Sequence, residues 1–158
     1  MSRKVDLVVL HTCECECRRG KAKAVARYFD HVNVSAHYIV DPGEVVAYAP
    51  EDRVCWHAPG VNLRSVGVEL CGYAAQTWDD PLSESELELA VALVAGICDR
   101  WSIPRVWLEN PRGASGITGH RQVTNAYCSG RGHQDPGVRF DGPGFAQAVA
   151  AHLAQRTP

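Results

Sequence analysis

Residues 5–11 have the sequence VDLVVLH, an apolar and mostly branched run that ends in a histidine. Such a short run of strand-forming residues is typical of a buried strand, so we predict a strand over Val5–Leu10 that leads into His11. A second short segment, Gly116–Thr118, predicts a strand that leads through a glycine into His120. Two histidines are therefore expected where strands end, and a rigid sheet can hold side chains there in fixed geometry.

A third run, SVGVELC at residues 65–71, predicts a strand whose side chains alternate between two faces. The period of two places Glu69 on the face opposite Val68 and Leu70. The runs Ala36–Val40 and Val45–Tyr48 flank a DPGE turn and predict a hairpin.

Helices are predicted between these strands. Lys21–Phe29 has one apolar face, and a long amphipathic pattern starts at Ser83, where Glu86 is in position to complete a capping box, and ends before Pro104. Phe145–Leu153 predicts a closing helix, and residues 121–141 are predicted to be a loop. The alternation predicts one α/β domain over residues 1–158, with a central mixed sheet flanked by helices.

The composition excludes several classes of protein. A formal net charge of -2 argues against nucleic-acid binding, which usually needs a basic excess. The first apolar run is too short for a signal peptide or a membrane span, so we expect cytoplasmic synthesis and no membrane insertion.

The chain has seven cysteines, an odd number that cannot all pair in disulfides. Cys55, Cys71 and Cys98 lie among apolar residues and are expected to pack in the core. The trio Cys13, Cys15 and Cys17 predicts a loop after a strand. A thiolate metal or redox site is the alternative, although the trio alone does not provide four thiolates.

The segment GHQDPG at residues 132–137 supplies a carboxylate held in a turn. Two imidazoles and one carboxylate suit Zn²⁺ and leave a fourth position for water. His11, His120 and Asp135 are therefore candidate zinc ligands.

Six motifs in order along the chain resemble the zinc-dependent N-acetylmuramoyl-L-alanine amidase family, which includes phage endolysins, anhydromuropeptide amidases and peptidoglycan-recognition proteins. The motif sequences most resemble those of amidase domains of mycobacteriophage-type endolysins. The motifs are VVLHT, SAHYIVDPGEVV, VCWHAPG, SVGVELCGY, ITGHRQV and GHQDPG.

The resemblance implies a role for each matching residue. His11, His120 and Asp135 match the zinc ligands, and Glu69 matches the acid that orients or deprotonates the water. His133 stands where many relatives have a lysine that stabilises the oxyanion. His57 and Asn62 match positions that line the substrate groove.

Two positions depart from some relatives. Ala36 replaces a tyrosine, which favours Glu69 as the base. Cys128 lies eight residues after His120, where other relatives have a cysteine ligand, so Cys128 is an alternative to Asp135 as the third ligand.

The resemblance implies a monomeric peptidoglycan hydrolase that cleaves the bond between N-acetylmuramic acid and L-alanine. We expect an endolysin that acts on the cell wall after release, with a cytoplasmic recycling amidase as the alternative setting. A non-catalytic peptidoglycan-binding module on the same fold is the alternative function.

Overall fold

The computed structural model describes residues 3–154, with side chains described as far as residue 152. Strands and helices alternate along most of the chain. The elements are β1 (Leu7–Thr12), α1 (Lys21–Phe29), β2 (Tyr38–Asp41), β3 (Glu44–Ala47), the 3₁₀ turn η1 (Asn62–Arg64), β4 (Ser65–Leu70), α2 (Pro81–Trp101), β5 (Gly116–Gly119), α3 (His120–Tyr127) and α4 (Gly142–Ala154).

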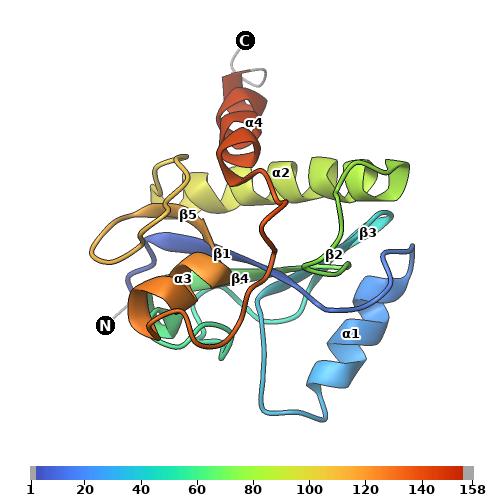
Figure 1. Cartoon of the computed structure of the whole chain (residues 1–158), viewed down its shortest axis with the longest axis horizontal. Helices are drawn as coiled ribbons and strands as arrows, with labels where there is room; N and C mark the ends of the chain where they lie inside the picture. The colour runs from blue at the N-terminus through green and yellow to red at the C-terminus, as the bar shows by residue number, and fades with distance from the viewer. Residues whose placement is uncertain (1–2, 155–158) are drawn as a thin grey trace.

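The strands form one mixed sheet in the order β3-β2-β4-β1-β5. β2, β4, β1 and β5 run parallel, and only β3 is antiparallel, as the second strand of the β2–β3 hairpin. Helices α2 and α4 cover one face, and α1 and α3 cover the other (Figure 1). The predicted α/β domain with a mixed, helix-flanked sheet is confirmed.

The two central strands present different side chains to the two faces. Val8 and Leu10 of β1, with Val68 and Leu70 of β4, belong to the core beneath α2 and α4. On the opposite face, β1 and β4 pair in register so that His11 lies beside Glu69. The predicted alternation of β4 is therefore confirmed, and both polar side chains emerge near the carboxyl ends of parallel strands, where ligands bind in many α/β proteins.

The predicted helix over Lys21–Phe29 is confirmed with the same bounds, and the hairpin forms within two residues of its predicted bounds. The first strand is shifted, because β1 starts at Leu7 and stays hydrogen-bonded to β4 as far as Thr12. His11 therefore lies within the strand rather than after it.

The predicted capping box of α2 is wrong. Asp80 caps the helix three residues earlier, and its Oδ1 atom accepts hydrogen bonds from the backbone N–H groups of Leu82 (3.0 Å) and Ser83 (3.2 Å). Pro81 occupies the first turn, a position that proline favours. Glu86 instead turns into the protein and accepts a 2.6 Å hydrogen bond from the backbone N–H of Cys71.

The loop predicted over residues 121–141 is also partly wrong, since its first part belongs to α3. The polar sequence HRQVTNAY hides this helix, and the tertiary contact of Val123 with Leu7 and Val9 supplies the missing apolar face. α4 begins at Gly142, three residues before its predicted start. Within residues 3–154, the helices lack the length and apolar character needed to cross a membrane.

Candidate metal centre

Three side chains from distant parts of the chain converge on one point. The Nδ1 atoms of His11 and His120 lie 3.0 Å apart. Asp135 faces both rings, with Oδ2 at 3.2 Å from Nδ1 of His11 and Oδ1 at 3.3 Å from Nδ1 of His120. All three residues are buried.

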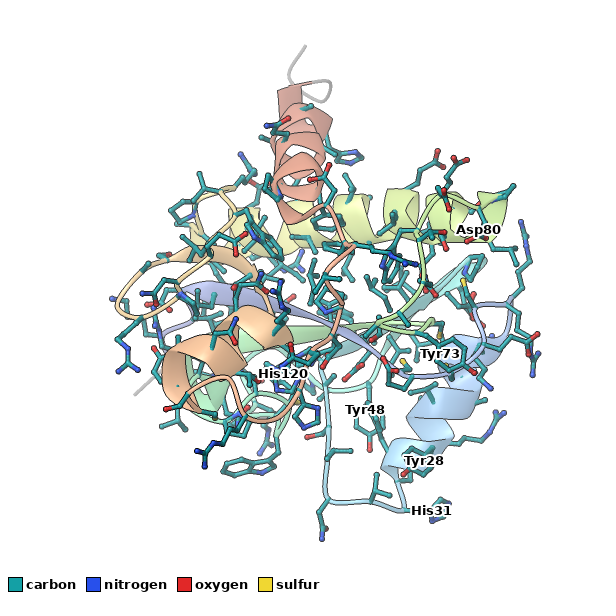
Figure 2. The ribbon with its side chains drawn as sticks, in the orientation of Figure 1. Tyr28, His31, Tyr48, Tyr73, Asp80 and His120 are labelled. Atoms are coloured by element: carbon teal, nitrogen blue, oxygen red, sulfur yellow. The ribbon has the colours of Figure 1, made fainter. Side chains whose placement is uncertain are left out.

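The fold fixes each of the three independently. His11 is held within β1, and His120 is the first residue of α3, directly after β5 (Figure 2). Asp135 is held at two atoms: its carbonyl oxygen accepts from the N–H of Arg121 at 2.8 Å, and its Oδ2 accepts from the N–H of Thr12 at 3.3 Å.

The turn after Asp135 requires glycine at position 137. Gly137 has a φ of 100°, and a Cβ atom there would lie 1.8 Å from the carbonyl oxygen of Ala74. This close approach seats the Asp135 turn against the segment that follows β4.

The spacing of the donor atoms fits a small metal ion. Nitrogen and oxygen ligands bind zinc at about 2.0–2.1 Å, so the edges of a tetrahedral site measure about 3.3 Å. The three distances above lie between 3.0 and 3.3 Å. Two imidazoles and one carboxylate also match the ligand types of catalytic zinc sites, which keep a fourth position open.

The charge states suit a cation as well. Burial lowers the pKa of His11 to about 4, so the ring is neutral at pH 7 and has a free lone pair. Burial alone would raise the pKa of Asp135, but hydrogen bonds and charges from His11 and His120 outweigh it and lower the pKa well below the usual range. Asp135 is therefore ionised.

A directional hydrogen-bond chain supports His11 from behind. Its Nε2 atom lies 3.0 Å from Nδ1 of His57, and Nε2 of His57 lies 3.2 Å from Oγ of Ser65. Ser65 in turn donates to the carbonyl oxygen of Val61 at 2.8 Å. If Nδ1 of His11 carries the lone pair, the Nε2–H of His11 donates to His57, the Nε2–H of His57 donates to Ser65, and the Ser65 hydroxyl donates to Val61. This series of hydrogen bonds fixes the tautomers of both rings.

Glu69 lies beside His11 in the sheet and lines the same cavity. Burial, reinforced by the negative charge of Asp135, raises the pKa of Glu69 to about 8. A carboxyl group with a pKa near neutrality can both accept and return a proton at physiological pH.

His133 occupies the open side of the centre. Its side chain is 70% exposed and stacks on His120, with ring centroids 4.3 Å apart. Its Nδ1 atom lies 3.8 Å from Oδ1 of Asp135. His133 thus lies at the mouth of the cavity beside the buried trio.

The cavity in front of the centre has a volume of about 420 Å³. The candidate substrate residues His57 and Asn62 both line it, as does the exposed ring of Trp56. Asn62 is also structural, because its Oδ1 atom accepts from the N–H groups of His57 (3.1 Å) and Ala58 (2.7 Å). Asn62 thereby holds the His57 loop.

Cys128 lies at the carboxyl end of α3, where its N–H donates to the carbonyl oxygen of Thr124. Among residues 3–154, the potential metal-binding groups include Asp135 and leave Cys128 out. Sequence reasoning also missed Ser65, which supports His57. The only available signal was its position on the same strand face as Glu69.

The family that matches residues 1–138 is N-acetylmuramoyl-L-alanine amidase (Amidase_2). This chain belongs to that family. An AmpD protein of Salmonella typhimurium, a 1,6-anhydro-N-acetylmuramyl-L-alanine amidase, is 30% identical over 129 residues, which are 76% of this chain. Those residues cover 59% of the Salmonella protein, so this chain spans less than two thirds of that relative's length.

Solved structures of a hydrolase and of an endolysin share the fold. The Staphylococcus aureus hydrolase AmiA superposes with a TM-score of 0.75 at 16% identity, covering 98% of this chain and 76% of AmiA. A mutant endolysin from Bacillus subtilis superposes with a TM-score of 0.69 at 21% identity, covering 94% and 87% of the two chains. At these identities the likeness establishes the fold alone.

Proposed function

We propose that the chain hydrolyses the amide bond between N-acetylmuramic acid and L-alanine in peptidoglycan, using Zn²⁺ held by His11, His120 and Asp135. The observation that carries this proposal is the convergence of a neutral imidazole, a second imidazole and an ionised carboxylate at the floor of an open cavity. Family membership and the chemistry named for AmpD support the same reaction.

Zinc, when bound, polarises a carbonyl group and acidifies water, the two effects that amide hydrolysis requires. Glu69 accepts the proton of the attacking water and returns it to the leaving amine of L-alanine. The charge of Zn²⁺ nearby would favour the ionised form of Glu69, which accepts this proton.

His133 and the cavity wall act on the substrate rather than on the metal. As charge develops on the carbonyl oxygen, an N–H of His133 donates to it from the mouth of the cavity. His57 and Asn62 line the groove, and the exposed indole of Trp56 supplies an apolar surface for sugar or peptide.

The complete ligand set favours an enzyme over the alternative, a peptidoglycan-binding module that does not cleave. We expect purified protein to contain zinc and to release fragments with new L-alanine amino termini from muropeptides.

Glu69→Gln should keep the zinc and lose at least about 100-fold in kcat. The matched control is Glu88→Gln, which alters an exposed carboxylate on α2. Full activity of Glu69→Gln would remove Glu69 from the mechanism.

We further propose that the enzyme is a phage endolysin that acts on the intact wall after release. The likeness to the Bacillus subtilis endolysin supports this setting, whereas the AmpD relationship supports cleavage of soluble anhydromuropeptides. Rates on intact sacculi and on soluble anhydromuropeptides, measured with the same enzyme sample, distinguish them. A strong preference for the soluble fragments would contradict the endolysin proposal.

A further inference from the structure

A second group of potential metal ligands lies on the same edge of the sheet. The Sγ atoms of Cys13, Cys15 and Cys71 all lie within 4.8 Å of one another. The sequence pattern singled out Cys17 instead of Cys71, but the Cys17 thiol points to Glu86, with Sγ 3.9 Å from its Oε2. Every cysteine within residues 3–154 is a free thiol.

The parallel register of β1 and β4 brings two of these cysteines together. His11 pairs with Glu69, and two residues further Cys13 follows β1 as Cys71 follows β4. The backbone pairing continues past the strands, because the N–H of Cys13 donates to Leu70 at 2.9 Å and that of Cys15 donates to Gly72 at 3.1 Å.

A left-handed residue brings in the third sulfur. Glu14 has a φ of 49°, a conformation that non-glycine residues rarely adopt. Its Oε1 atom accepts from the hydroxyl of Thr12 (2.6 Å) and from the N–H of Ala74 (2.9 Å), which holds the bend in place. The bend directs Cys13 and Cys15 to one point, whereas in a regular strand their Cα atoms would lie about 6.5–7 Å apart.

The thiols are accessible to an ion, because Cys13 and Cys15 are only half-buried. A cavity of about 350 Å³ opens beside Cys13 and Cys15, between the sheet edge and α1. Lys21, Glu69 and Tyr28 also line this cavity, and Tyr28 is labelled on α1 in Figure 2. The Lys21 ammonium supplies positive charge near the thiols.

We propose that Cys13, Cys15 and Cys71 form a three-thiolate site for a thiophilic metal ion of the Zn²⁺, Cd²⁺ or Cu⁺ class. Metal–sulfur bonds of about 2.3 Å around a shared ion require sulfur separations of about 3.8–4.0 Å, a small contraction of the present arrangement. Three thiolates select soft ions, unlike the nitrogen and oxygen donors around Asp135. Binding releases the thiol protons to solvent, and Lys21 partly offsets the remaining negative charge.

The site is tested by titrating Cd²⁺ into the reduced full-length chain and following the ultraviolet thiolate-to-cadmium absorption band. We expect a band that saturates at one equivalent and is lost in Cys13→Ser and in Cys15→Ser, whose side chains are half-buried. Cys17→Ser is the matched control and should keep the band. Displacement of Cd²⁺ by Zn²⁺ or by Cu⁺ identifies the preferred ion.

Two further measurements separate this site from the amidase centre and from misfolding. Asp135→Ala should keep the thiolate band, so failure of the proposed function and failure of this site are distinguishable. Cd²⁺ should also protect Cys13 and Cys15 of the unmodified sequence from alkylation, as mapped by mass spectrometry. A band that survives Cys15→Ser, a band that needs Asp135, or full alkylation in Cd²⁺ would overturn the proposal.

Discussion

Nε2 of His11 lies 3.0 Å from Nδ1 of His57, on the side of the His11 ring away from His120 and Asp135. His57 is therefore placed to set the tautomer of a candidate metal ligand, in addition to lining the cavity. The same ring is held by Ser65 at its other nitrogen.

We predict that His57→Ala lowers zinc affinity by about 10–100-fold, the usual effect of losing a partner that orients a ligating histidine. Competition with a chromophoric chelator measures the change. His31→Ala, at an exposed histidine, is the control. Ser65→Ala should lower the affinity less, because His57 keeps its contact with His11. Unchanged affinity in His57→Ala would show that His57 acts on substrate alone.

In a Cys15→Ser background, which removes the proposed thiolate site, Asp135→Ala should abolish tight zinc binding, because only two imidazoles remain and the one anionic donor of the set is gone. Cys128→Ser should retain stoichiometric zinc, since this thiol lies outside the group. Metal content after gel filtration, measured by mass spectrometry, separates the two variants. Zinc loss in Cys128→Ser with retention in Asp135→Ala would make Cys128 the ligand.

Gly67→Ala should destabilise the protein by about 1–3 kcal/mol, because a new Cβ atom would lie 2.7 Å from Cγ of His57. Gly96→Ala in α2 is the opposite case, since its Cβ would meet only the flexible end of Arg100. That change should stabilise by about 0.5–1 kcal/mol. Urea unfolding measures both. Equal effects of the two substitutions would contradict the packing of His57 on β4.

Glu86 should make stability fall as pH rises. Burial raises its pKa from the ordinary 4.5 to about 9, with the charge of Asp41 adding to the effect. Between these values the folded chain holds a proton that the unfolded chain has lost, so the free energy of unfolding decreases by up to about 1.4 kcal/mol per pH unit.

Glu86→Gln removes this titration while its amide oxygen still accepts from Cys71. The free energy of unfolding, measured in urea at pH 5.5 and pH 8, should therefore depend less on pH in Glu86→Gln. Glu84→Gln, at an exposed position two residues earlier, should follow the unsubstituted chain. Identical pH dependence in all three would mean that Glu86 is ionised in the folded state.

The strands and most helices were predictable because their periodicity is local. α3 was not, since it contributes few apolar residues and depends on contact between Val123 and β1. The cap of α2 was misplaced because Asp80 and Ser83 are both capping residues, and only tertiary structure shows Glu86 turning inward toward Cys71.

The candidate site was predictable residue by residue but not in its connections. Histidines at strand ends and a carboxylate in a turn suggested His11, His120 and Asp135. One hydrogen bond joins His11 to His57 and a second joins His57 to Ser65. No helical or strand periodicity in the sequence predicts these two contacts. Cys71 likewise joined Cys13 only through the parallel pairing of β1 and β4.

That pairing also restricts how the chain can evolve. His11 in β1 and Cys13 directly after it face the same side of the sheet because they are two residues apart, and Glu69 in β4 and Cys71 directly after it follow the same spacing. Insertion or deletion of a single residue within β1 would turn the side chains of both His11 and Cys13 toward the α2 face at once. The histidine centre and the thiol cluster are therefore inherited or lost together under such changes, while point substitutions can alter either one alone.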